Sequence, residues 1–199
     1  MYDTGKYKDC CRCDLCKTRR HVVQYTLWNS DSLKDTDVLW IGEAPGPMEN
    51  ILGIPFCGDA GRIMSLLLDD VHRYHKKHHA ITNVVCCIPY NNIHNRDFRA
   101  PREEEINACA PRLNDFIDNC DPNLIVLLGK VARGHVLRLI EEHQINVRCP
   151  MVAVTHPSYM NRGMTHQGSQ AFNEAVAVVR TVLDRMMNYP YNVAEVVLD

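Results

Sequence analysis

Four short apolar runs, each followed by a longer segment with helical periodicity, constrain the fold of this chain more than any other feature. The runs are residues 37–42 (DVLWIG), 80–86 (AITNVVC), 123–129 (NLIVLLG) and 151–155 (MVAVT). They are typical of strands buried on both faces of a parallel sheet. The helical segments are residues 60–75, 101–120, 130–143 and 169–187. This alternation requires right-handed crossovers and predicts an α/β fold, a three-layer αβα sandwich with a central, mostly parallel four-stranded sheet.

The length of the chain sets its domain organisation. A chain of 199 residues can bury a sizeable core as one domain, so we expect a single domain over 1–199, with an N-terminal arm at 1–36 and a tail at 188–199. No apolar run approaches the roughly 18 residues of a membrane span. The first residues, MYDTGKYKD, lack the apolar stretch of a secretory signal. We therefore expect an intracellular protein without a membrane partner. Pro111 is expected to interrupt or bend the second helical segment.

Cysteine is abundant and unevenly distributed. The chain has ten cysteines, four of them within CCRCDLCK at residues 10–17. In a reducing compartment such thiols indicate metal ligation or burial before disulfides, and thiolates without histidine suit an iron–sulfur cluster or zinc. The net charge of -2 does not indicate a nucleic-acid binder. The histidine-rich stretch at 71–79 resembles metal spacing, but its place before a strand favours a solvated or weakly basic helix end.

Distinctive loops follow three of the predicted strands. The loops are GEAPGPMEN (42–50) and GIPFCGDAG (53–61) after the first strand, CCIPYNN (86–92) after the second, and THPSYMNRG (155–163) after the fourth. In an open parallel sheet, ligands bind at the carboxyl ends of the strands. We therefore expect these loops to converge on one pocket.

The order of these motifs resembles that of family-4 uracil-DNA glycosylases, the iron–sulfur branch of the uracil-DNA glycosylase superfamily. The resemblance rests on an N-terminal CxxC, GEAPG, PFxGxAG, TNVV followed by C-x-P-x-N, an isolated cysteine early in a helix, and THPSY, over about residues 10–187. It implies an enzyme that flips uracil out of DNA and hydrolyses its N-glycosidic bond, leaving an abasic site for base excision repair. The implied partner is DNA containing uracil. We expect the protein to be a monomer. A replication protein would be a further partner.

The resemblance also implies a [4Fe-4S] cluster, with zinc as the alternative. The implied ligands are Cys10, Cys13, Cys87 and Cys109. Cys13 and Cys16 form the alternative N-terminal pair. Cys86 would face away from the ligands if the strand alternates through it. The remaining candidates, expected to be buried thiols, are Cys57, Cys120 and Cys149.

Three residues are implied to bind the base. Phe56 would stack on the flipped ring. Asn83 would pair with O4 and N3–H of uracil, because a side-chain amide offers a donor and an acceptor together; cytosine presents the reversed pattern. His156 would donate to the charge that develops on uracil O2, as a neutral ring if necessary.

The GEAPG motif is implied to act on the sugar side of the bond. The backbone at Gly42 and Ala44 would approach the sugar and base. Glu43 would bring a carboxylate near the attacking water. Because Ala44 replaces the aspartate that another branch uses there, either Glu43 or backbone groups would orient that water. Glu49 would block the C5 methyl group of thymine, although Asn50 replaces the aspartate that usually follows it.

The last loop is implied to contact DNA. Ser158 would bind a phosphate, Met160 would act as an apolar wedge, and Arg162 would contact the backbone. Departures in the loop after Cys87 leave another modified pyrimidine open as the substrate. A catalytically silent member that binds DNA or a replication partner is the other alternative, and intact Glu43, Asn83 and His156 argue against it.

Overall fold

A five-stranded sheet forms the centre of the computed structural model, which describes residues 4–92, 97–160 and 170–188. The strand order is β1–β3–β2–β6–β7, where the strands are Tyr25–Trp28 (β1), Val38–Gly42 (β2), His79–Asn83 (β3), Leu124–Leu128 (β6) and Met151–Val154 (β7). The strands β3, β2, β6 and β7 pair in parallel, and β1 pairs antiparallel with the outer edge of β3. The α/β expectation is confirmed. The additional strand was not predicted because β1 is a short edge strand without a fully apolar run.

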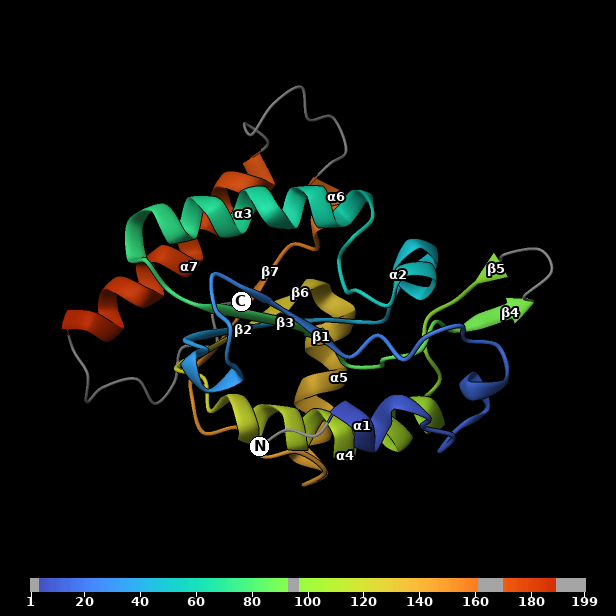
Figure 1. Ribbon diagram of the computed structural model, residues 1–199. Coiled ribbons are helices and arrows are strands. Elements are labelled where there is room, and N and C mark those ends of the chain that lie inside the picture. The colour runs from blue at the N-terminus through green and yellow to red at the C-terminus, as the bar shows by residue number, and fades with distance from the viewer. Residues whose placement is uncertain (1–3, 93–96, 161–169, 189–199) are drawn as a thin grey trace.

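Helices cover both faces of the sheet (Figure 1). On one face lie α3 (Asp59–His75), α6 (Pro157–Met160) and α7 (Gln170–Asn188); on the other lie α1 (Thr4–Lys8), α4 (Glu103–Cys120) and α5 (Gly129–Glu141). Successive residues of β2 enter opposite cores, since Leu39 packs with α4 and α5, and Trp40 packs with α3 and α7. Burial on both faces explains why these strands read as continuous apolar runs.

Shorter elements lie between these. They are the 3-10 turns η1 (Asp14–Lys17) and η2 (Leu33–Asp35), the helix α2 (Pro47–Leu52), and a hairpin of β4 (Tyr90–Asn92) and β5 (Asp97–Phe98). The helix α4 runs through Pro111 without interruption. Apolar side chains on both sides of Pro111, such as Ala110 and Leu113, are buried, and this burial outweighs the one backbone hydrogen bond that proline removes.

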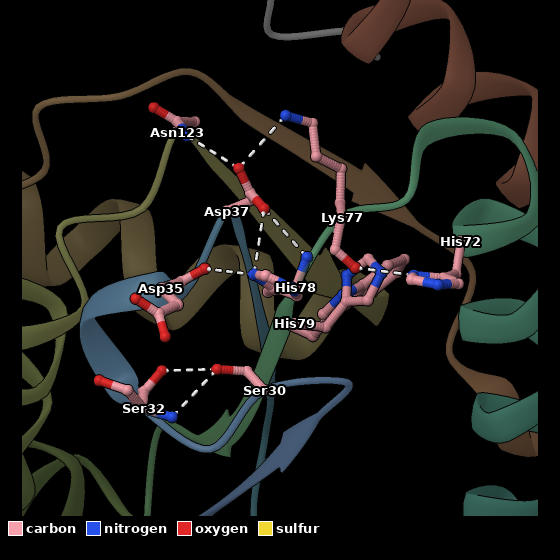
Figure 2. Close-up of polar contacts among 10 residues, drawn as sticks. Ser30, Ser32, Asp35, Asp37, His72, Lys77, His78, His79 and Asn123 are labelled. Carbon is pink, nitrogen blue, oxygen red and sulfur yellow. Dashed lines mark hydrogen bonds and ion pairs between the residues drawn. The ribbon is translucent and has the colours of Figure 1, made fainter.

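Polar contacts around Asp37 join three strands at the amino end of the sheet (Figure 2). Its Oδ2 accepts a hydrogen bond from the backbone N–H of His78 at 3.0 Å. Its Oδ1 accepts from Nζ of Lys77 at 3.2 Å and from Nδ2 of Asn123 at 3.3 Å. These contacts set the starts of β2, β3 and β6 against one another, at the end of the sheet opposite the loops that follow the strands.

The histidine-rich segment departs from a simple solvated helix end. His79 is the first residue of β3 and is fully buried. Its Nδ1 accepts a hydrogen bond from Nε1 of Trp40 at 3.1 Å, and burial lowers the pKa of His79 to about 3. His79 is thus a neutral core residue. Over the described ranges, no three histidine, cysteine, aspartate or glutamate side chains are arranged as metal ligands, and none of the helices is long and apolar enough to cross a bilayer.

Candidate active site and cysteine pocket

Gly42 and Asn83 end the adjacent parallel strands β2 and β3 and face each other in register. A Cβ atom built on Gly42 would lie 2.4 Å from Oδ1 of Asn83 and 2.7 Å from Cζ of Phe56. Position 42 therefore has no room for a side chain. Glycine, which has no Cβ atom, permits the close approach of Asn83 and Phe56. The strand pairing places Asn83 beside Gly42, and the Phe56 ring reaches the same glycine.

The amide of Asn83 is buried without its full set of partners. Asn83 is 2% exposed, and its Oδ1 has no hydrogen-bond partner among the described residues. An unsatisfied buried acceptor costs about 1–3 kcal/mol. Such an atom at the carboxyl end of a parallel strand suits a site that receives an N–H donor from a ligand.

Phe56 sits in a strained turn beside His156. The φ angle of Phe56 is 52°, in the left-handed region that non-glycine residues rarely adopt. The ring centroids of Phe56 and His156 are 6.0 Å apart, with an interplanar angle of 37°. A Cβ atom on Gly61 would lie 1.8 Å from the carbonyl oxygen of Phe56, so this turn also depends on a glycine. Strain of this kind is concentrated at functional sites.

His156 follows β7 and is held by the next turn. Its Nδ1 lies 3.2 Å from the backbone nitrogen of Ser158, which donates to it, and 2.8 Å from Oγ of Ser158. Burial lowers the pKa of His156. The neutral ring therefore carries its proton on Nε2. Gly129 has a φ of 89°, and a Cβ atom built on it would lie 3.0 Å from Cβ of His156. This residue was not predicted to support the site, because a glycine at the end of a strand is the only feature of the sequence that marks it.

The GEAPG motif continues from β2 beside the segment that follows β3. The carbonyl oxygens of Gly42 and Glu43 accept hydrogen bonds from the N–H groups of Val84 and Val85, at 2.8 Å and 3.0 Å. The Glu43 side chain is half-buried, and burial raises the pKa of its carboxyl group. Ala44 packs against the core on the α4 side. A partly desolvated carboxyl group directly after β2 is a candidate for proton or charge chemistry.

Glu49 is engaged with the backbone of the Phe56 turn. It is 8% exposed, and its Oε1 accepts hydrogen bonds from the N–H groups of Cys57 at 3.0 Å and Gly58 at 2.9 Å. Next to it, Oδ1 of Asn50 accepts from the backbone N–H of Arg20 at 2.8 Å. These two side chains of α2 therefore hold the Phe56 turn and the N-terminal arm.

The last loop agrees only in part with the expected DNA contacts. Ser158 is exposed. Met160 has an exposed fraction of 0% and packs in the core with α3 and α7, so it does not form the surface wedge that the sequence suggested. The large exposed side chain here is Tyr159, with an exposed fraction of 58%. Arg162 lies outside the described residues.

A pocket lies between the N-terminal arm, the segment after β3 and α4. Six cysteines line it: Cys10, Cys13, Cys16, Cys86, Cys87 and Cys109. Cys86 does not point away, as alternation would require, because β3 already ends at Asn83; its thiol contacts that of Cys109. The thiol of Cys16 contacts that of Cys11.

The six thiols of this pocket are of a type that ligates a metal centre, although among the described residues no three of them are already arranged as ligands. Burial is the largest cause of the raised pKa of Cys13 and of Cys87, and the charges of nearby cysteines add to it. A positive metal centre would relieve this repulsion and stabilise the thiolates. Of the three cysteines expected to be buried thiols, Cys120 is buried, whereas Cys57 and Cys149 are only partly buried.

Comparisons with known proteins identify the family of this chain. The model of the uracil DNA glycosylase superfamily matches residues 30–180. The type-4 uracil-DNA glycosylase of Saccharolobus solfataricus is 33% identical over 131 residues, which are 66% of this chain and 56% of the relative. The type-4 uracil-DNA glycosylase of Thermotoga maritima is 30% identical over 171 residues, which are 81% of this chain and 83% of the relative.

Structure comparison supports the same fold. A solution NMR structure of a candidate uracil DNA glycosylase from Methanosarcina acetivorans matches with a TM-score of 0.51 and 12% identity, and covers 80% of this chain and 97% of that chain. The match spans 56% of the length of the relatives from Saccharolobus solfataricus and Sulfurisphaera tokodaii. By the family model and the Thermotoga maritima relative together, this chain belongs to the type-4 family of the uracil DNA glycosylase superfamily.

Proposed function

We propose that this protein is a uracil-DNA glycosylase, which extrudes uracil from intracellular DNA and hydrolyses its N-glycosidic bond to leave an abasic site. The buried, unpartnered Oδ1 of Asn83 carries the proposal. Uracil supplies the N3–H donor that this oxygen lacks, and its O4 accepts from the amide nitrogen. Cytosine, whose N3 is an acceptor, would leave the buried oxygen unsatisfied, at a cost of about 1–3 kcal/mol.

The neighbouring side chains divide the remaining work. Phe56 offers a ring face on which the extruded base stacks. His156 donates from Nε2 to uracil O2 as negative charge develops there, which lowers the barrier to departure of the base. Glu43 and the backbone around it orient the attacking water and stabilise the positive charge on the sugar. Ser158 and Arg162 bind the DNA backbone.

The cysteine pocket supports a [4Fe-4S] cluster held by Cys10, Cys13, Cys87 and Cys109. Each of these thiols takes part in the charge interactions of Cys13 and Cys87, whereas the strongest interaction of the Cys16 thiol is with Cys11. The cluster would join the N-terminal arm to α4 and the end of β3, a structural role away from the bond that breaks. Zinc bound by the same thiolates is the alternative.

Release of free base tests the proposal directly. The substrates are end-labelled oligonucleotides, single- and double-stranded, that carry one uracil, 5-hydroxymethyluracil, hypoxanthine, thymine or cytosine. We expect uracil release to fall about a hundredfold or more in His156→Ala and Asn83→Ala, to a residual rate that single-turnover kinetics still measure, while both variants stay folded. Release of another modified pyrimidine in place of uracil would reassign the substrate. Binding of uracil-DNA without release of any base would identify a catalytically silent member.

A further inference from the structure

Arg112 is a buried cation that joins the base pocket to the cysteine pocket. Its side chain extends from α4 and is 3% exposed. Nη1 donates to Oγ1 of Thr82 at 2.9 Å, and Nη2 donates to the carbonyl oxygens of Asn83 and of Val84, the latter at 3.1 Å. One guanidinium group thus binds three consecutive residues at the end of β3.

The same side chain also reaches the candidate metal ligands. Arg112 lines the cysteine pocket and contacts the thiol of Cys109, which lies three residues earlier on the same face of α4. Thr82 continues the connection on the other side, since its hydroxyl donates to the carbonyl oxygen of Gln24, the N-terminal-arm residue directly before β1.

We propose that Arg112 is a positioning residue for Asn83 and thereby for the selection of uracil; this inference rests on the proposed glycosylase function. The base-reading amide projects from a residue whose carbonyl oxygen Arg112 holds from behind. The following residue is held from both sides, because the Val84 carbonyl accepts from Arg112 and the Val84 N–H donates to Gly42. These contacts hold the backbone of Asn83 beside Gly42, where a Cβ built on Gly42 would lie 2.4 Å from Oδ1 of Asn83.

The rigid, planar guanidinium group is essential to this role. Arginine presents its donors in a fixed fork, whereas lysine has a single nitrogen that cannot span the same three acceptors in one geometry. Loss of this buried, charge-assisted contact would leave carbonyl groups unsatisfied and allow Asn83 to move with them. Transition-state stabilisation would then fall, and kcat/KM for uracil release would drop about tenfold to a hundredfold. Arg112 does not touch the reacting atoms itself.

A double-mutant cycle tests the inference. Arg112→Met should lower kcat/KM for uracil release about tenfold to a hundredfold in the otherwise unchanged protein, and Arg112→Lys should lower it less. In the Asn83→Ala background, Arg112→Met should add no further loss, because the group that it positions is absent. Equal losses in both backgrounds would overturn the inference and assign Arg112 a general structural role, and unchanged kcat/KM in both Arg112 variants would also overturn it.

The matched control is Arg138→Met on α5. Arg138 binds Asn107 of α4 at 2.9 Å and Glu142 at 2.7 Å, so it also holds α4 but does not touch β3. It should leave kcat/KM for uracil release near that of the unchanged protein. Iron content is measured in parallel, and rates are compared per iron-loaded chain, so that loss of the metal centre is not mistaken for misplacement of Asn83.

A readout without catalysis separates this inference from the proposed function. Arg112→Lys should speed amide hydrogen exchange at Val84 and Val85, whose N–H groups bond to Gly42 and Glu43, and leave exchange in α7 unchanged. Exchange that does not change at Val84 and Val85 would overturn the positioning role even if the enzyme released uracil. If the unchanged protein released no base, the proposed function would fail, while faster exchange would still support the role of Arg112 in fixing Asn83.

Discussion

The backbone N–H of Ser158 donates to Nδ1 of His156 across 3.2 Å. A nitrogen that accepts from a backbone amide cannot carry the proton of a neutral imidazole, so that proton lies on Nε2. Burial lowers the pKa of His156 and favours the neutral ring. The turn after β7 therefore selects both the charge state and the tautomer of the proposed donor.

This geometry predicts the pH dependence of uracil release. A lowered pKa keeps His156 neutral to a more acidic pH than the ordinary value of 6.5. The single-turnover rate should therefore show no histidine limb at or above pH 6.5 as the pH falls from about 8 to 5. A limb centred there, and absent in His156→Gln, would contradict the neutral-donor assignment.

Ser158→Ala separates the two contacts that Ser158 makes. The variant removes the hydroxyl group and keeps the backbone N–H that fixes the tautomer. We expect weaker binding of uracil-DNA, because the phosphate contact is lost, with kcat nearly unchanged. A large fall in kcat with unchanged DNA affinity would show that the hydroxyl group, and not the N–H, controls His156. Titration of binding and single-turnover kinetics distinguish these outcomes.

Gly42→Ala should block the base pocket. The new Cβ atom would lie 2.4 Å from Oδ1 of Asn83, closer than real Cβ contacts occur, so the amide and the Phe56 ring must shift. We expect loss of uracil release of at least about a hundredfold in kcat/KM, the size of a lost buried contact together with the clash.

Gly134→Ala is the matched control for that substitution. Gly134 lies within α5 and its Cβ would meet nothing within 4 Å. Alanine there should raise the free energy of unfolding by about 0.5–1 kcal/mol, because glycine is a poor helix former, and leave activity unchanged. Equal activities of the two variants would show that Gly42 does not define the pocket.

Hydrophobic periodicity was sufficient to predict the sheet and the main helices, because burial on two faces produces long apolar runs. It failed at β1, where a half-buried edge strand gives a weak signal, and at Cys86, where the strand ends before the alternation rule can apply. The prediction of Met160 as a surface wedge was wrong. A residue in a loop motif is expected to be exposed, but the burial of Met160 depends on contacts with α3 and α7, which lie outside that motif. Arg112 carried no local signal, since its partners lie about thirty residues away in β3.

Glu49→Ala tests which role this buried carboxylate has. Its Oε1 binds the N–H groups of Cys57 and Gly58, so removal leaves two backbone donors unsatisfied. We expect a loss of about 1–3 kcal/mol in the free energy of unfolding and weaker uracil release, because Phe56 loses its support. Glu49→Gln, which keeps one acceptor oxygen, should lose less of both. Release of thymine by Glu49→Ala without any loss of stability would instead support a role in blocking the C5 methyl group.

Single substitutions can identify which N-terminal cysteines hold the metal centre. The charge of Cys10 acts on Cys13 and Cys87, while the Cys16 thiol is engaged with Cys11. Cys10→Ser should therefore lower iron and acid-labile sulfide per chain together with the visible absorbance, as Cys87→Ala should, whereas Cys16→Ser should retain all three in anaerobically purified protein. The reverse order, with iron lost in Cys16→Ser and kept in Cys10→Ser, would establish Cys13 and Cys16 as the pair. Zinc bound in equal amounts by colourless protein would replace the cluster with a structural zinc site.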